Sequence, residues 1–159
     1  MQVSVRRITT EEDRQIAIAV LKATYKEEKN WIDDDDRLFD PAELTDENIA
    51  WFVCLNKDEP VGVVRVMFEL PLELYTEYGM EQIGPEINVK EFIDNNRIAE
   101  IGRLAVIPEY RRHKVIALSL MRDATKETID RGYSHFVTDV FEGEKNSPYD
   151  FHTRVLGFV

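Results

Sequence analysis

The sequence has one cysteine, Cys54, among its 159 residues, and it has no long apolar stretch. A lone thiol excludes an intramolecular disulfide and a cysteine-cluster zinc site, and it fits a reducing compartment. No run approaches the ~18 apolar residues of a membrane-spanning helix. The amino terminus, MQVSVRRITTEED, lacks the apolar region of an export signal. These absences predict a cytoplasmic protein without a membrane span.

Positive charge is also scarce. Lysine and arginine total 20 against 31 aspartates and glutamates, so the formal net charge is −11. This balance argues against nucleic acids and anionic membranes as partners, and any anionic ligand must bind at a local basic cluster. With 43% hydrophobic and 32% charged residues the composition is that of a globular protein. The length predicts a single domain over residues 1–159.

The apolar pattern predicts strands and helices in the order β-α-β-β-loop-β-α-β-α. β-branched and aromatic residues mark the strands, at 3–8, 49–56, 61–70, 98–106 and 135–140. KDEP is the turn of a hairpin between the second and third strands. Breaker residues make 71–96 irregular, and the acidic segment 30–48 is a loop with at most one helical turn.

Three helices are predicted. The first has its capping box at Thr9 and Glu12 and runs through Glu27. Its apolar face comprises Ile16, Ala19, Val20 and Ala23. The second spans 115–131 and ends at Gly132. Its core side comprises Leu118, Met121 and Ala124. The third begins at Ser147 as its N-cap.

A basic run stands where the fourth strand passes into the second long helix. The segment EIGRLAVIPEYRRHKVIALSL places Arg111, Arg112, His113 and Lys114 together at this junction. A helix start offers unpaired N–H groups and the positive end of the dipole, and arginine and lysine bind phosphate well. The run therefore predicts a phosphate or pyrophosphate seat, with a solvated basic loop as the alternative.

The element order, VIPEYRR entering a helix, and the closing LGF resemble the GNAT superfamily of N-acyltransferases. The resemblance implies an α/β fold with a mixed, mainly antiparallel sheet flanked by helices and splayed at the fourth strand. The usual GNAT turn is R/Q-x-x-G-x-G/A, but here Lys114 and Ile116 stand in the glycine slots after Arg111. The superfamily usually adds a strand after LGF. The chain stops at Val159, so truncation, a disordered tail or an exchanged strand, as in a homodimer, is open.

A narrower likeness concerns two strands. EIGRLAV resembles the E-x-S-R-F/L-A-V strand of acyl-homoserine-lactone synthases and N-acyl amino acid synthases, with Gly102 in place of the serine. PVGVVRVMFELP resembles their G-x-x-R-L-x-P stretch and brings Arg65 to its arginine. That group commonly lacks the glycine-rich turn and takes its acyl chain from acyl carrier protein. The resemblance implies acyl-phosphopantetheine or acyl-CoA as the donor and a small amino-acid-like amine as the acceptor.

Glu100 is the candidate general base, because a strand carboxylate can accept the proton of an attacking ammonium. Its structural alternative is an ion pair with Arg97 or Arg103. A regular strand turns Arg103 to the opposite face from Glu100, unless the bulge usual in this family re-aims it toward a substrate. The resemblance further implies that the backbone after such a bulge holds the pantetheine arm. The implied donor-binding residues are Leu104, Ala105, Val106, Arg111, Arg112, His113, Lys114 and Val115.

Other site assignments rest on single residues. The leaving thiolate needs a proton donor, and the usual tyrosine slot holds Thr153, which leaves Tyr149 or His152 as substitutes. Arg65, in an apolar strand, needs an anion, either in the acidic run at 33–36 or on the acceptor. Trp31 either roofs a substrate pocket or anchors its loop. The acidic run lacks the spacing of a calcium loop and is expected to be a solvated rim, so no metal site is predicted.

The sequence thus predicts acyl transfer from a pantetheine thioester to an amine, without a metal. A complex with acyl carrier protein would use the basic run together with Arg122 and Lys126 of the following helix. Two other functions stay open. One is a plain acetyl-CoA-dependent acetyltransferase of small amines or polyamines, and the other is a GNAT-shaped binding module without catalysis.

Overall fold

A computed structural model describes residues 1–26, 34–69, 88–138 and 149–158. The strands are β1 (Val3–Arg7), β2 (Ile49–Asn56), β3 (Glu59–Met67), β4 (Ile98–Val106) and β5 (His135–Val137). The α-helices are α1 (Glu11–Leu21), α2 (Asp35–Leu38), α4 (Val89–Asn95) and α5 (Lys114–Asp130). Shorter helical turns of other types are Lys22–Lys26, Pro41–Leu44, Pro108–Tyr110 and Phe151–Val155. Within the described ranges, no helix is both long and apolar enough to cross a bilayer.

The strands form one sheet in the order β1-β2-β3-β4-β5. The first three pairings are antiparallel, and only β4 and β5 run parallel. This arrangement confirms the predicted mixed, mainly antiparallel sheet. The hairpin between β2 and β3 also lies where the sequence places it, and its turn contains Lys57 with a positive φ of 57°.

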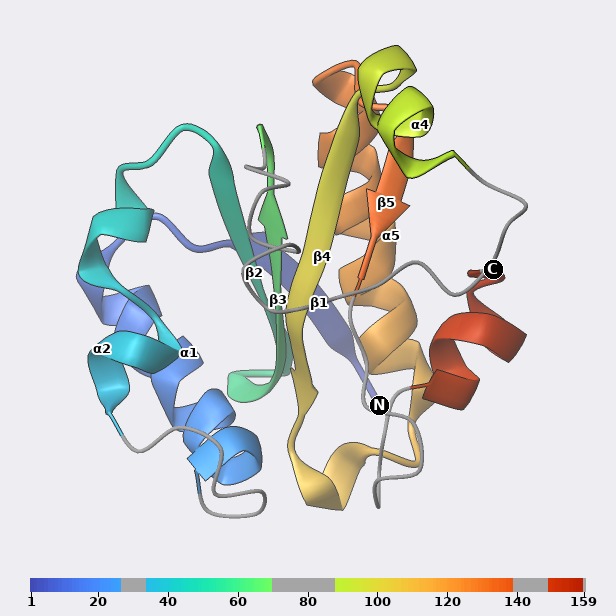
Figure 1. Cartoon of the computed structure of the whole chain (residues 1–159). Helices are drawn as coiled ribbons and strands as arrows, with labels where there is room; N and C mark the ends of the chain where they lie inside the picture. Colours follow the sequence, from blue (N-terminus) through green and yellow to red (C-terminus); the bar gives the residue numbers. More distant parts are fainter. Residues whose placement is uncertain (27–33, 70–87, 139–148, 159) are drawn as a thin grey trace.

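Helices cover both faces of the sheet (Figure 1). One face packs against α1 and α2, and the other against α5, because side chains alternate along each strand. In β2, Trp51 and Val53 belong to the core under α1, whereas Phe52 and Cys54 belong to the core under α5. The sheet thus separates two apolar cores, and successive residues of a strand pack against opposite helix layers.

The start and the inner face of α1 differ from the prediction. Thr10, not Thr9, is the N-cap, and its hydroxyl accepts a hydrogen bond from the Asp13 N–H at 3.2 Å. The predicted apolar face is wrong for Ala19, which is exposed. The residues of the helix that are buried are Arg14, Ala17, Ile18, Val20 and Leu21. The physical reason is Arg14, a charged residue at a core position, which shifts the buried face away from the one that hydrophobicity alone indicates.

The second long helix is confirmed at nearly its predicted bounds, with Gly132 following it at a φ of +79°. Met121 and Ala124 face the core as expected, but Leu118 is 42% exposed, so its predicted burial is wrong. The deepest contact is made by Ile116 and Leu120 instead, because they face β3 at Gly62. A Cβ on Gly62 would lie 2.9 Å from Cγ2 of Ile116 and 3.1 Å from Cδ1 of Leu120.

Two further predictions concern the segments that follow β3 and β5. Residues 89–95 are helical, not irregular, because Asn88 caps α4 by accepting a hydrogen bond from the Glu91 N–H at 3.2 Å. The predicted N-cap Ser147 lies outside the described residues. The last described helical turn, Phe151–Val155, has π-helical geometry and is followed by Gly157 at a φ of +78°.

Candidate active site

The fourth strand is interrupted by a bulge. Val63 pairs with Ala105 and Arg65 pairs with Gly102, so two residues of β4, Arg103 and Leu104, stand opposite one residue of β3. Arg103 has a φ of +52°, a left-handed conformation that is uncommon for a residue with a side chain. Bulges of this kind bend a strand and redirect its side chains.

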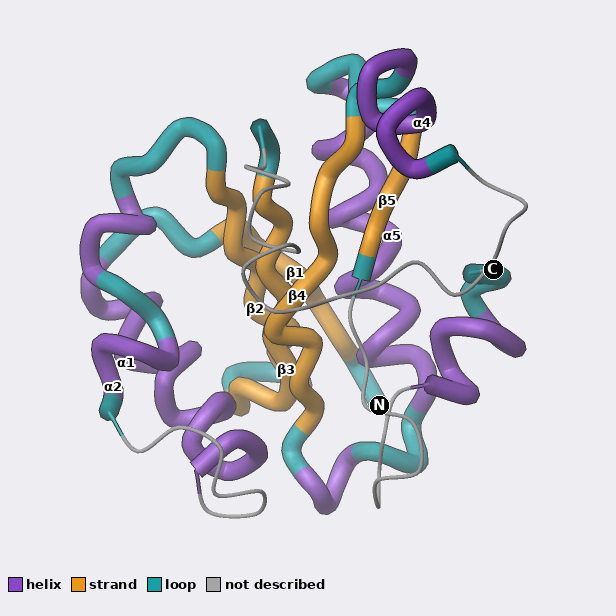
Figure 2. The backbone as a smooth tube through the Cα atoms, viewed as in Figure 1, coloured by secondary structure: helices purple, strands orange, loops and turns teal. Residues whose placement is uncertain are grey.

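The pairing of β4 with its other neighbour, β5, ends at Glu100, before the bulge. The short strand β5 pairs with β4 only over Ile98–Glu100 and ends at Val137, before β4 does (Figure 2). Among the described residues, nothing pairs as a strand with the later part of β4 on this side. Within the residues that the structure describes, the sheet is therefore open on this side of β4 from the bulge onward.

The alternation of the backbone shows which groups face the open side. The Ile107 N–H donates to the Val61 carbonyl on β3 at 3.1 Å. In an extended strand, successive residues turn their N–H and C=O groups to opposite edges, so those of Val106 face away from β3. Consistently, the Val106 carbonyl accepts a hydrogen bond from Nε of Arg111 at 3.0 Å. Arg111 thereby ties the turn after β4 to the open edge.

Glu100, Gly102 and Arg65 meet on the face of the sheet that α1 and α2 cover. A Cβ built on Gly102 would lie 3.5 Å from Oε1 of Glu100 and 3.7 Å from Nη2 of Arg65. Arg97, one of the predicted structural partners of Glu100, is engaged elsewhere. It donates to Oε1 of Glu69 at 3.3 Å and stacks over the Tyr133 ring at 4.1 Å.

Arg65 has a structural anion among the described residues, and this anion is Glu43 rather than a residue of the acidic run at 34–36. Nη1 of Arg65 donates to Oε1 of Glu43 at 3.1 Å, and both side chains are largely buried, at 15% and 16% exposure. Nε1 of Trp51 donates to the other oxygen of Glu43 at 2.6 Å. The guanidinium also lies over the Trp51 ring, 5.6 Å from its centroid. Glu43 thus links the arginine and the tryptophan through its two carboxylate oxygens.

The bulge turns Arg103 toward the same side as Glu100. Its Nη2 donates to the backbone carbonyl of Arg37 at 3.2 Å, and its guanidinium lies 5.5 Å from the centroid of the Tyr25 ring. Both partners belong to the layer of α1 and α2. The bulge therefore re-aims the Arg103 side chain, and Arg103 does not point to the opposite face from Glu100 as it would in a regular strand.

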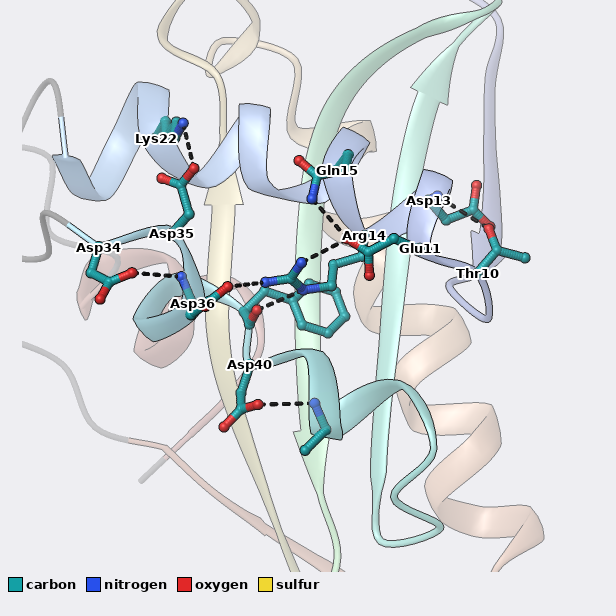
Figure 3. Close-up of polar contacts among 12 residues, drawn as sticks. Thr10, Glu11, Asp13, Arg14, Gln15, Lys22, Asp34, Asp35, Asp36 and Asp40 are labelled. Atoms are coloured by element: carbon teal, nitrogen blue, oxygen red, sulfur yellow. Dashed lines mark hydrogen bonds and ion pairs between the residues drawn. The ribbon is translucent and has the colours of Figure 1, made fainter.

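Asp34 and Asp36 of the acidic run are exposed, as expected of a solvated rim, and the run also has a structural use (Figure 3). Arg14, only 3% exposed, donates to Oδ1 of Asp36 at 2.7 Å, to Oε1 of Glu11 at 2.8 Å and to the carbonyl of Phe39 at 2.8 Å. Asp34 caps α2 through the Asp36 N–H, and Asp35 pairs with Lys22. Asp33 lies outside the described residues.

The start of α5 is cationic and has no side-chain cap. His113 is the N-cap residue, but its side chain makes no capping hydrogen bond, and the first turn contains no acid. Arg112, His113 and Lys114 are all exposed there. The start of α1, in contrast, has a threonine cap and three acidic residues in its first turn. The start of α5 is thus electrostatically suited to an external anion.

The two replaced glycines of the family turn have different surroundings. Lys114 is exposed at the first helical position. Ile116 is fully buried and points at Gly62 on β3, so its side chain occupies the core rather than the mouth of the turn. Position 116 holds isoleucine instead of the family's glycine, and Gly62 on the sheet beneath it leaves room for that side chain.

The candidate proton donors lie at the carboxyl-terminal end. Tyr149 is 38% exposed, and its carbonyl accepts a hydrogen bond from the Thr153 hydroxyl at 2.9 Å. His152 is 3% exposed and has the Phe151 and Phe158 rings at 6.1 and 5.3 Å from its own. Trp31 lies outside the described residues.

Sequence reasoning missed Glu43, Trp51 and Arg14 as parts of this region. Trp51 stacks on Phe39 with ring centroids 4.1 Å apart, and the Arg65 guanidinium lies over the Trp51 ring. Nothing in the local pattern singles out Glu43, because it sits in a polar turn. A buried charged pair is found only when the two chain segments are placed together.

A bulged, half-open fourth strand leading into a cationic helix start defines the GNAT class of fold. The acetyltransferase (GNAT) family matches residues 14–158, so the chain belongs to this family of acyltransferases. Solved structures agree. An N-acyl amino acid synthase, FeeM, from uncultured soil microbes has a TM-score of 0.71 at 14% identity, and the match covers 99% of this chain and 79% of the synthase.

Two other solved structures are similar over nearly the whole chain. AAC(6')-Iy, in complex with the bisubstrate analogue CoA-S-monomethyl-acetylneamine, has a TM-score of 0.70 at 14% identity, with 100% of this chain and 92% of that one covered. A transcriptional regulator from Bacillus halodurans C-125 has a TM-score of 0.67 at 18% identity, with 99% and 93% covered. At these identities the likeness establishes the fold. No curated protein sequence matches significantly.

Proposed function

We propose that the protein is an N-acyltransferase that moves an acyl group from a pantetheine thioester to the primary amine of a small amino-acid-like acceptor. One observation carries this proposal: the Glu100 carboxylate, the open edge of β4 at Val106 and the cationic start of α5 follow one another along a single strand-to-helix connection. They would supply, in order, a base, a backbone donor for the thioester arm and a seat for its phosphate.

The start of α5 supports a phosphate-bearing donor. Cations near a helix N-terminus are unfavourable by ~0.3–1 kcal/mol each, and the first N–H groups have no acceptor within the helix. The first turn has no side-chain cap and no acid, so the charge cost stands in the free protein. The cost of unpaired N–H groups stands in part, because the Ile116 N–H donates to the His113 carbonyl at 3.0 Å. A bound phosphate would accept from these N–H groups and pair with Arg112 and Lys114, which offsets both.

Acyl carrier protein is the donor we prefer. Lys114 carries its side chain at a position where the family turn has a glycine, so a single phosphate suits the turn better than the pyrophosphate of coenzyme A. Docking would add the exposed cations of α5. Arg122 and Lys126 are 71% and 76% exposed, although each is paired with an aspartate of the same helix.

Acetyl-CoA is the second candidate donor, and the position of Ile116 favours it. Because this side chain lies against Gly62 in the core, it does not obstruct the turn. A plain acetyltransferase of small amines would then need only that Lys114 move aside or pair with the second phosphate.

The proposed reaction is a direct transfer. Glu100 accepts a proton from the acceptor's ammonium, directly or through water, and the freed lone pair attacks the thioester carbonyl carbon. The Val106 N–H stabilises the oxyanion of the tetrahedral intermediate. The C–S bond then breaks as the nitrogen loses its second proton to water and the amide forms, and the thiolate takes a proton from a nearby acid, which water reprotonates. No covalent enzyme intermediate is required.

We assign the proton for the leaving thiolate to Tyr149 in preference to His152. A leaving group must reach its acid, and Tyr149 is 38% exposed whereas His152 is 3% exposed beside two phenylalanine rings. Tyr149→Phe should therefore lower turnover while leaving donor binding intact.

Product analysis by mass spectrometry tests the proposal. The protein is incubated with acyl-CoA and acyl carrier protein donors of several chain lengths and with pools of amino acids and amines. We expect an N-acyl amino acid, formed best from carrier protein. Acetylated amines from acetyl-CoA alone would favour the second candidate. Stabilisation by coenzyme A without any product would identify a binding module, and the enzyme proposal would then be wrong.

The phosphate seat has its own test. Replacing Arg112 and Lys114 by alanine should weaken donor binding by about tenfold or more, since each charge-assisted hydrogen bond contributes ~1.5–3 kcal/mol. The donor in this test is acyl-CoA, which has no carrier protein to dock on α5. Lys126→Ala is then the control, because it removes another exposed cation of α5 that lies about three turns further along the helix. Equal effects of the two changes would argue for a diffuse charge effect instead of a seat.

A further inference from the structure

Gly102 occupies the middle of β4 without a structural reason within the described residues. A glycine inside a strand is destabilising relative to alanine and often marks a place where a ligand approaches closely. Among the glycines that the structure describes, those with positive φ are Gly132 and Gly157, so the backbone at Gly102 does not require a glycine. A Cβ there would make only ordinary contacts, at 3.5 Å to Glu100 and 3.7 Å to Arg65.

Gly62 shows what a sterically required glycine looks like in the same sheet. Its Cβ would lie 2.9 Å from Ile116 and 3.2 Å from the carbonyl of Ala105, which are closer than ordinary Cβ contacts. Gly102 has no such neighbours. Packing among the described residues therefore demands a glycine at position 62 and leaves room for a larger residue at position 102.

The space above Gly102 lies between opposite charges. On one side is Oε1 of Glu100, and on the other is Nη2 of Arg65. Nη1 of Arg65 is held by Glu43 and the guanidinium lies over Trp51, so the group is fixed in orientation before any ligand arrives. Within the described part of the chain, Nη2 makes no hydrogen bond, and buried Nε also lacks an acceptor. The arginine therefore retains Nη2 as a donor on the side of Gly102.

We propose that the gap at Gly102 seats the two charged groups of an α-amino acid acceptor, with its carboxylate on Nη2 of Arg65 and its ammonium facing Glu100. An α-amino acid carries both groups on one carbon, so one ligand can pair with the cation and the anion that flank the place where a Cβ of Gly102 would stand. This inference rests on the proposed function and makes Gly102 its specificity-determining residue. It predicts that the acceptor is a free α-amino acid, not a simple amine.

Ligand binding tests the inference without relying on catalysis. Thermal unfolding of the wild-type protein is followed with single L-amino acids, each compared with its primary amide. At least one free amino acid should raise the unfolding midpoint, and its amide should not, because the amide cannot pair with the guanidinium as a carboxylate does. No shift with any free amino acid, or equal shifts with acid and amide, would overturn the inference.

Gly102→Ala sharpens this test, because it should not damage the fold. The unliganded variant should unfold at or above the wild-type midpoint, since alanine fits the described surroundings. The shift with the amino acid should be lost, and acceptor KM should rise about tenfold or more, as one extra methyl group in a fitted site does. The donor KM should stay within about twofold. An undiminished shift in this variant would show that the acid binds elsewhere.

Gly62→Ala is the matched control. It should lower the midpoint because its Cβ collides with Ile116, yet the amino acid should stabilise it by the same shift as the wild type. The outcomes separate the two proposals. Acid-selective binding with no acylated product from any donor would keep the Gly102 seat and refute the enzyme proposal. Equal acylation of free amino acids and of simple amines would support the enzyme proposal and refute the Gly102 seat.

Discussion

The contact between Gly62 and Ile116 gives a quantitative prediction about how this chain replaces a family glycine. Adding a methyl group at Gly62 brings its Cβ to 2.9 Å from Cγ2 of Ile116, 3.1 Å from Leu120 and 3.2 Å from the Ala105 carbonyl. Overpacking a close-packed core costs ~1–3 kcal/mol. Because a backbone carbonyl cannot rotate away, we expect Gly62→Ala to lie in the upper half of that range.

Removing the opposing side chain should reverse part of this loss. Ile116 is fully buried, so Ile116→Ala alone costs ~2–5 kcal/mol through lost burial and a cavity. In the double variant, the methyl group that Gly62→Ala adds lies against the space that Cγ2 of Ile116 vacates, and it fills part of that cavity. The combined loss should therefore be smaller than the sum by ~1 kcal/mol or more, a typical coupling between residues in contact.

Urea unfolding of the wild type, the two single variants and the double variant measures this coupling, with the m-value checked for constancy. For a chain of this size each kcal/mol corresponds to ~2–4 °C in Tm. Leu38→Ala combined with Gly62→Ala is the control, because Leu38, the last residue of α2, is buried in the other core. That pair should be additive. Additive losses for Gly62 and Ile116 would refute the view that the two residues share one packing site.

Three further predictions concern single sites. Thr10→Ala should destabilise the protein by ~0.5–2 kcal/mol in urea unfolding, because it removes the cap of α1. Thr9→Ala should have little effect. A larger loss from Thr9→Ala than from Thr10→Ala would identify Thr9 as the cap. Glu100→Gln should lower kcat by about 10²–10⁴-fold with little change in donor binding, as loss of a general base does, and unchanged turnover would remove Glu100 from the mechanism. Burial raises the pKa of the Cys54 thiol to about 11, above its ordinary value of 9.0, so stability should be lost as pH rises from about 9 to 11. In Cys54→Ala, the free energy of unfolding should depend less on pH over this range. The same pH dependence in the variant and the wild type would contradict this cause.

The elements that the sequence predicts well are those with uninterrupted apolar patterns. The β2–β3 hairpin and β4 follow from runs of β-branched and aromatic residues, and α5 follows from its periodicity and from Gly132. The pattern failed at α1 because Arg14 is buried at a core position. Its three acceptors, on Glu11, Asp36 and Phe39, make that burial tolerable, but one of them is 25 residues away.

The candidate site was predictable to the extent that it lies on one continuous segment. Glu100 and the basic run could be placed because a strand leads directly into a helix. The partner of Arg65 could not, since Glu43 reaches it from a polar turn across 22 residues. The direction of Arg103 also depends on a bulge, which is a property of how β4 pairs with β3 rather than of either strand alone.

The most direct measurement follows the acyl group and the nitrogen in the same reaction. A thioester donor labelled in its acyl carbonyl carbon is mixed with an amino acid labelled at its nitrogen, and products, free thiol and intact protein are analysed by mass spectrometry over time. The account predicts an amide that carries both labels, one thiol released for each amide, and no label on the protein. An acylated protein intermediate, or thiol release with free acid and no amide, would contradict direct transfer to an amine.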